Sequence, residues 1–91
     1  MSYHQLGIVA QLADDLPGAR EWYLKSLEIK ERRGNEGGAA LTYALLGTLE
    51  HAAGDGPAAK QWFEKALSIF EKRGDKVNIA KVKALLDSLV K

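Results

Sequence analysis

The residues of this chain that could take part in catalysis or metal binding are few and scattered. His4 and His51 are the only histidines and there is no cysteine, so the sequence does not supply the usual set of metal ligands. Ser26 and Ser68 have no histidine nearby in the sequence that could act as the base of an activated serine. We therefore predict no catalytic residue, no metal site and no cofactor.

Three other patterns look like functional motifs but have simpler structural interpretations. The glycine-rich run 34–38 lacks the Lys-Ser or Lys-Thr pair of a phosphate-binding loop, so we interpret it as a turn. Asp14 and Asp15 fit helix capping better than acid–base catalysis. Trp22 and Trp62 could stack on nucleic-acid bases, but no basic groove accompanies them, and we assign them to packing. The chain is predicted not to be an enzyme.

The composition is that of an ordinary globular domain. The 91 residues, 46% hydrophobic and 27% charged, allow one hydrophobic core and one domain. The net charge of +1 produces no long-range field that would favour nucleic acid as a partner. No apolar run approaches the roughly 20 residues that span a bilayer, and residues 1–16 lack the pattern of a signal peptide. We expect a cytoplasmic protein with neither a membrane nor a nucleic-acid partner.

A repeat with a period of 40 residues dominates the sequence. Residues 43–75 align with residues 3–35, and 14 of these 33 positions are identical. The identical pairs are Tyr3/Tyr43, Leu6/Leu46, Gly7/Gly47, Ala13/Ala53, Asp15/Asp55, Pro17/Pro57, Ala19/Ala59, Trp22/Trp62, Lys25/Lys65, Leu27/Leu67, Ile29/Ile69, Glu31/Glu71, Arg33/Arg73 and Gly34/Gly74. A third, partial copy begins near Ala80. A period of about 20 to 50 residues indicates stacked units that bury their apolar faces against each other.

Turn signals divide the repeats into helices. Gly-Asn or Gly-Asp pairs at 34–35, 54–55 and 74–75 are typical of a helix end followed by the N-cap of the next helix. Pro17 and Pro57 fit the first turn of a helix, where a missing N–H costs little. The apolar positions recur at helical spacing and never alternate as in a strand. We predict helices over 2–13, 17–33, 37–53, 57–73 and 76–90, with consecutive helices antiparallel.

The two copies share a motif of aromatic and small residues. The first helix of each copy reads Tyr-x-x-Leu-Gly, starting at Tyr3 and Tyr43, and the second reads Ala-x-x-x-aromatic, starting at Ala19 and Ala59. This pattern resembles the tetratricopeptide repeat. Its period of 40 rather than about 34 residues looks like the long repeats of kinesin light chains and of scaffolds that bind G-protein α subunits. The second helices should therefore be longer than usual.

The resemblance implies an all-α fold, a right-handed superhelical solenoid of antiparallel helix pairs. About two and a half repeats would form one domain over residues 1–91. We expect the first repeat at 1–35, the second at 36–75 and a C-terminal capping helix at 76–91.

The resemblance also implies a ligand-binding groove lined by the first helix of each repeat. In the first two repeats, the residues expected to bind a partner there are His4, Gln5, Ile8, Gln11, Leu12, Leu45, Thr48 and His51. The strip is mostly apolar and neutral, which favours an extended peptide or an amphipathic helix as the ligand. Positions that form a carboxylate clamp in some relatives hold His4, Ile8 and Thr48, so we do not expect a chaperone tail as the partner.

A second interpretation belongs to a different class of function. The groove and the edges of the repeats could instead be surfaces for neighbouring repeats or for a second copy of the chain. The chain would then be a structural or self-assembling segment of a larger array, without a ligand of its own.

Overall fold

The computed structural model describes residues 2–89, which form five α-helices and no strand. The helices are α1 (Tyr3–Leu12), α2 (Leu16–Arg32), α3 (Glu36–Ala52), α4 (Gly56–Arg73) and α5 (Lys76–Leu89). Every helix end lies within one residue of the predicted end, except that the predicted end at residue 90 lies outside the described residues. The predicted all-α fold is confirmed.

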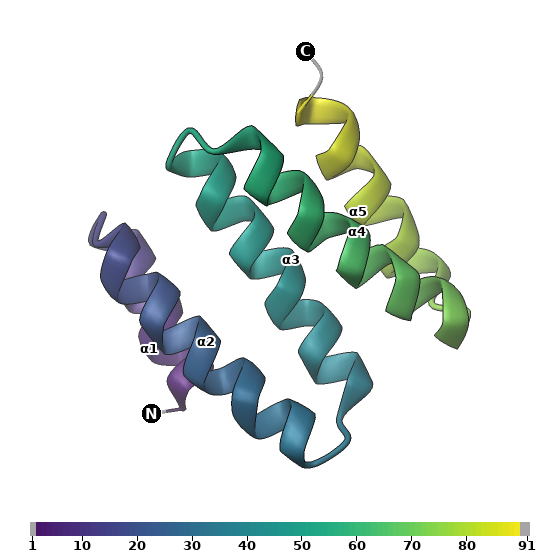
Figure 1. The fold of residues 1–91 in the computed structure, drawn as a ribbon, viewed down its shortest axis with the longest axis horizontal. Coiled ribbons are helices and arrows are strands. Elements are labelled where there is room, and N and C mark those ends of the chain that lie inside the picture. The colour runs from purple at the N-terminus through teal and green to yellow at the C-terminus, as the bar shows by residue number, and fades with distance from the viewer. Residues whose placement is uncertain (1, 90–91) are drawn as a thin grey trace.

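Consecutive helices pack against each other along the chain (Figure 1). Each helix runs antiparallel to the one before it, and α3 lies between α2 and α4. The stack measures 35 × 30 × 18 Å along its principal axes. The proposed repeat boundaries after residues 35 and 75 fall at the turns that precede α3 and α5. The right-handed sense of the superhelix stays a prediction.

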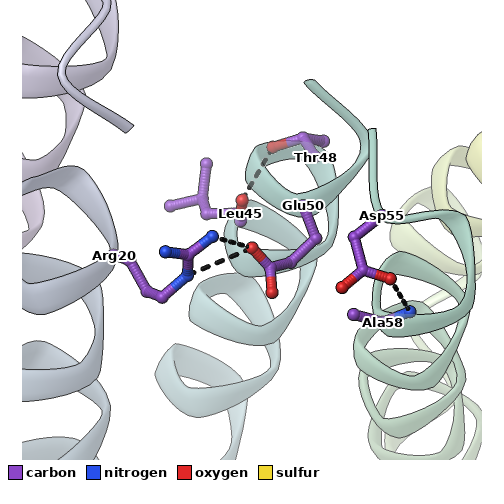
Figure 2. Close-up of polar contacts among 6 residues, drawn as sticks. All are labelled: Arg20, Leu45, Thr48, Glu50, Asp55 and Ala58. Atoms are coloured by element: carbon purple, nitrogen blue, oxygen red, sulfur yellow. Dashed lines mark hydrogen bonds and ion pairs between the residues drawn. The ribbon is translucent and has the colours of Figure 1, made fainter. Parts of the chain in front are cut away.

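Side-chain caps begin the helices where the sequence predicts them. The Asp15, Asn35 and Asp55 side chains each accept a hydrogen bond from the backbone N–H three residues later, at 3.0, 2.9 and 3.1 Å. Figure 2 shows the Asp55 cap on the N–H of Ala58. Such caps satisfy backbone donors that the first helical turn leaves unpaired. The assignment of Asp15 to capping rather than catalysis agrees with this geometry.

The turns between helices contain one residue with a left-handed backbone. The φ angles of Gly34, Gly54 and Gly74 are 67°, 84° and 69°, in the region that glycine adopts without a Cβ penalty. Asp14 occupies the corresponding place between α1 and α2 with a φ of 62°. The first turn therefore has the same shape as the others but carries a residue with a side chain.

The helices of each repeat approach closely where glycine faces an aromatic ring. A Cβ added at Gly7 would overlap the ring of Tyr23, and one added at Gly47 would overlap the ring of Phe63. Tyr23 is 0% and Phe63 1% exposed. The recurring mid-helix glycine, which costs about 1 kcal/mol in helix propensity, thus has the packing reason that the sequence suggested.

Two hydrophobic clusters hold the stack together, and both join neighbouring repeats. In the first cluster, Tyr23 and Leu27 of α2 pack with Leu46 and Leu49 of α3. In the second, the aromatic residues of α4 pack with α5, including Phe70 and Val82. Each helix pair therefore buries part of its apolar surface against the helix that follows it, as expected of repeat proteins.

Each tryptophan stacks on a tyrosine of its own repeat, and Trp62 also packs against the cluster between α2 and α3. The Trp22 ring stacks on Tyr3 with ring centroids 5.6 Å apart, and the Trp62 ring stacks on Tyr43 at 5.7 Å. The Lys25 ammonium lies 5.0 Å from the centroid of the Trp22 ring. The interpretation of both tryptophans as packing residues is consistent with these contacts.

We expect Gly47→Ala to lower the free energy of unfolding by about 1–3 kcal/mol, because the new methyl group overpacks against the buried Phe63 ring. Gly37→Ala is the matched control, since its methyl group would meet only the Arg73 guanidinium at 3.5 Å. The control should be neutral or stabilising by up to about 1 kcal/mol. Urea unfolding followed by circular dichroism measures both, and a stabilised Gly47→Ala variant would contradict the packing argument.

The left-handed turn residues give a second prediction. We expect Gly54→Ala to cost about 1 kcal/mol of stability, because alanine is strained at a φ of 84°. Asp14→Gly makes the reverse change at a φ of 62° and should stabilise by less than about 1 kcal/mol. Thermal unfolding of both variants tests the pair, and shifts of the same sign would argue against backbone strain as the cause.

Candidate functional site

A pocket of about 320 Å³ lies where the first helices of the successive units come together. We call it the central pocket. It is lined by His4 of α1, by Leu41, Ala44, Leu45 and Thr48 of α3, by Phe70 of α4, and by Asn78, Lys81, Val82 and Leu85 of α5. The lining is mostly apolar, and Leu41 remains 46% exposed beside it.

A second pocket, of about 580 Å³, lies at the open end of the first helix pair. We call it the edge pocket. It is lined by Ser2, Tyr3, His4 and Gln5 at the start of α1, by Ser26, Ile29, Lys30 and Arg33 at the end of α2, and by Asn35 and Leu41. His4 and Leu41 line both pockets, so the two pockets adjoin at these residues.

The structure places four of the predicted partner-binding residues in these pockets. His4, Leu45 and Thr48 line the central pocket, and Gln5 joins His4 in the edge pocket. Leu41, Phe70, Asn78 and Lys81 also line the central pocket but were not among the predicted residues. Leu41 follows the helical period of the groove face, whereas Phe70 lies on a second helix and gave no such signal.

The other four predicted residues line neither pocket. Ile8 and Leu12 are exposed on α1, and Leu12 is 83% exposed. His51 is exposed near the end of α3. Gln11 is half-buried, and its side-chain oxygen Oε1 accepts a hydrogen bond of 2.9 Å from the Tyr23 hydroxyl. Their assignment to partner binding stays a prediction.

Several polar groups of the groove face already bond within the chain. The Thr48 hydroxyl donates to the carbonyl of Leu45 at 2.8 Å, as Figure 2 shows. The Gln5 side chain accepts from the N–H of Ser2 at 3.0 Å as part of a capping box. These bonds position the side chains and occupy one polar atom of each. A ligand would have to use their remaining donors and acceptors.

The ion pair between Arg20 and Glu50 joins the two repeats. Both Arg20 Nε, at 3.1 Å, and a terminal guanidinium nitrogen donate to the same carboxylate oxygen (Figure 2). Glu50 is the more buried partner, with 13% of its side chain exposed. The pair therefore links α2 to α3 across the repeat boundary.

The electrostatics of the edge pocket come from two partly buried basic groups. Burial lowers the pKa of His4, and the nearby Lys30 ammonium lowers it further. Burial also lowers the pKa of Lys30, whose ammonium donates to the Thr42 hydroxyl at 3.0 Å. Within residues 2–89, the buried Nδ1 of His4 has no hydrogen-bond partner. Burial and the nearby Lys30 ammonium thus both disfavour the charged form of the His4 imidazole.

The lining of the edge pocket contains a serine and a histidine but no carboxylate among the described residues. Ser26 and His4 both line the edge pocket, but among the described residues no hydrogen bond joins them and no carboxylate lines that pocket. An activated serine needs such a bond and a group that orients the base. In the described part of the chain, no three His, Cys, Asp or Glu side chains are grouped to hold a metal ion.

None of the five helices in residues 2–89 is both long enough and apolar enough to cross a bilayer.

The comparison with known families agrees with the repeat pattern and the fold. The model of the tetratricopeptide repeat matches residues 1–72, whereas no curated protein and no solved structure matches the chain. Repeats of this kind generally mediate protein–protein interactions or form scaffold arrays. The finer similarity to kinesin light chains and G-protein scaffolds stays a prediction. With a match over most of its length and five helices in antiparallel pairs, the chain belongs to the tetratricopeptide repeat family.

Proposed function

We propose that this chain is a protein–protein interaction module that binds a peptide segment in the groove formed by α1, α3 and α5. The observation that carries the proposal is the central pocket, whose walls come from the first helix of each successive unit. Its apolar lining with a few polar groups is typical of sites that bind apolar side chains and orient them with hydrogen bonds.

Leu41 is the best anchor point for such a ligand. It is exposed, it lies on α3 at the centre of the stack, and it lines both pockets. A peptide side chain that packs on Leu41 would cover apolar surface on both sides of His4. Leu45 and Ala44 continue this surface along α3 toward α5.

The ligand can be an extended peptide or an amphipathic helix. An extended segment would cross both the edge pocket and the central pocket, which adjoin at His4 and Leu41. A helix would place an apolar stripe against Leu41 and Leu45 and could reach Ile8 on α1. Ile8→Glu therefore reports whether the ligand runs along α1.

We expect Leu41→Glu to weaken binding of a peptide ligand by about tenfold or more, because the charge replaces an apolar contact. The ligands are peptides selected on the wild-type chain from a random dodecapeptide library, and fluorescence anisotropy measures their affinity. Leu24→Glu is the matched control, since Leu24 is 42% exposed, similar to the 46% of Leu41, but lines neither pocket. Equal effects of the two variants, or failure to select any peptide, would argue against the groove.

A self-assembling segment is the second candidate, and the outer face of α1 supports it. Val9 is 49% exposed, whereas its repeat counterpart Leu49 is 0% exposed and packs in the cluster between α2 and α3. Tyr3 is also exposed, whereas its counterpart Tyr43 is half-buried against that cluster. An apolar face that is buried in one repeat and open in the other suits docking of a further second helix.

If this face assembles, light scattering on a size-exclusion column should detect dimers or larger species that grow with protein concentration. Val9→Glu should then return the chain to a monomer, because it places a charge in the contact. Leu24→Glu again serves as the control on another helix. A wild-type chain that stays monomeric over the whole concentration series would exclude self-assembly through α1 and leave the groove as the functional surface.

A further inference from the structure

Helix α1 has the composition of a helix that is covered on both sides. It contains no Asp, Glu, Lys or Arg, whereas each of the other four helices carries charged side chains. Among the described residues, four of the seven exposed large apolar side chains lie on α1, namely Tyr3, Ile8, Val9 and Leu12. A helix with one face in solvent normally carries polar and charged residues on that face. The free face of α1 therefore has the character of an interface.

A second copy of the chain offers two free helix faces that could cover α1. Within the described stack, α2 packs against α1 and α3, and α4 packs against α3 and α5. Neither α2 nor α4 is therefore open to dock on another copy. The two end helices are α1 and α5, which lie at opposite ends of the stack (Figure 1). Contact between two copies through the ends of the stack must use α1, α5 or both.

The free face of α5 is polar and does not suit the apolar face of α1. By repeat phase it corresponds to the face of α3 that packs on α4, where Tyr43 is half-buried and Gly47 receives the Phe63 ring. In α5 these two positions hold Lys83 and Asp87, which are both exposed. Burial of these charges against an uncharged helix would leave them unpaired, at a cost in desolvation. Head-to-tail stacking of α1 on α5, which would build an open array, is disfavoured.

We propose that α1 pairs with α1 of a second copy in a closed two-fold dimer. The inference rests on the self-assembly candidate and adds its contacting helix and its stoichiometry. A two-fold contact uses the same surface on both chains and leaves none to extend it, so assembly stops at two. Two α1 helices can meet without like-charge repulsion and without burial of an unpaired charge, since neither carries a charged side chain.

The repeat indicates which residues form the contact. Leu46 and Leu49 of α3 pack with α2 and are both 0% exposed, whereas their counterparts on α1 are the half-buried Leu6 and the 49% exposed Val9. Leu6 and Val9 lie three residues apart, and so on the same side, near the middle of the ten-residue helix. An antiparallel pair of α1 helices would place Leu6 of each copy against Val9 of the other. The symmetry makes this contact twice.

Light scattering on a size-exclusion column over a wide concentration series measures the stoichiometry. We expect dimers and no larger species at the highest concentration. The dimers should dissociate on dilution, because a ten-residue helix, about 15 Å long, makes a small interface. Val9→Glu and Leu6→Lys should each raise the dimer dissociation constant by about tenfold or more, because each buries an unpaired charge. Circular dichroism checks that both variants keep their helices.

An equimolar mixture of the two variants tests the antiparallel register. In a mixed dimer the new carboxylate of one chain would face the new ammonium of the other, so dimers should form at concentrations where each variant alone is monomeric. Ala84→Glu is the matched control, because it adds the same charge at an exposed position of α5 outside both pockets. It should leave the dimer dissociation constant unchanged.

The outcomes separate this inference from the self-assembly candidate on which it rests. Oligomers that keep growing with concentration and are reduced by Ala84→Glu would overturn the closed dimer and keep self-assembly as an open array. A dimer that resists both α1 variants would overturn the α1 contact, and a mixture that stays monomeric would overturn the antiparallel pairing.

A wild-type chain that is monomeric at every concentration would overturn both self-assembly and the dimer. A synthetic peptide with the sequence of residues 17–33 then identifies the other occupant of this face, a second helix from outside the chain. Binding of that peptide to the monomer, with loss of affinity in Val9→Glu, would assign the face to such a helix in place of a second copy.

Discussion

The close contact between a mid-helix glycine and a buried aromatic ring is the constraint on which the rest of the structure depends. Gly47 lets the Phe63 ring lie directly against the backbone of α3, and Gly7 does the same for Tyr23 against α1. Because each ring is buried and closely packed, it fixes the distance between the two helices of its pair. The same aromatic residues, Tyr23 and Phe63, also belong to the clusters against which the following helices pack.

The repeated packing makes each departure from the repeat informative. Where the two copies differ but both residues are aromatic, as at Tyr23 and Phe63, both side chains are buried in the equivalent cluster. Two polar substitutions lie at the edge pocket of the first helix pair, where His4 and Lys30 stand in place of Ala44 and Phe70 of the second copy. A repeat protein can carry such costs locally, because each interface contributes its own share of stability.

The fold could be predicted almost completely, and the candidate site only in part. Helix ends follow from local signals such as the Asp55 cap and the left-handed Gly54, and they came out within one residue. The groove face followed from helical phase, which placed His4, Leu45 and Thr48 in the central pocket. Phase alone could not show that Leu12 stands 83% exposed, that Gln11 bonds to the Tyr23 hydroxyl, or that α4 reaches the pocket through Phe70.

The sequence by itself determined the repeat, its family and the order of the helices, because these depend on residue periodicity and on caps and turns that act over a few residues. Only the tertiary structure decided which side chains meet. It brought Lys30 of α2 to Thr42 of α3, left the buried nitrogen of His4 without a partner in residues 2–89, and opened two adjoining pockets around Leu41. The shape of the pockets and the desolvation of Lys30 and His4 arise where helices pack across the repeat boundary. No local pattern along the chain encodes these contacts between residues that are far apart in the sequence.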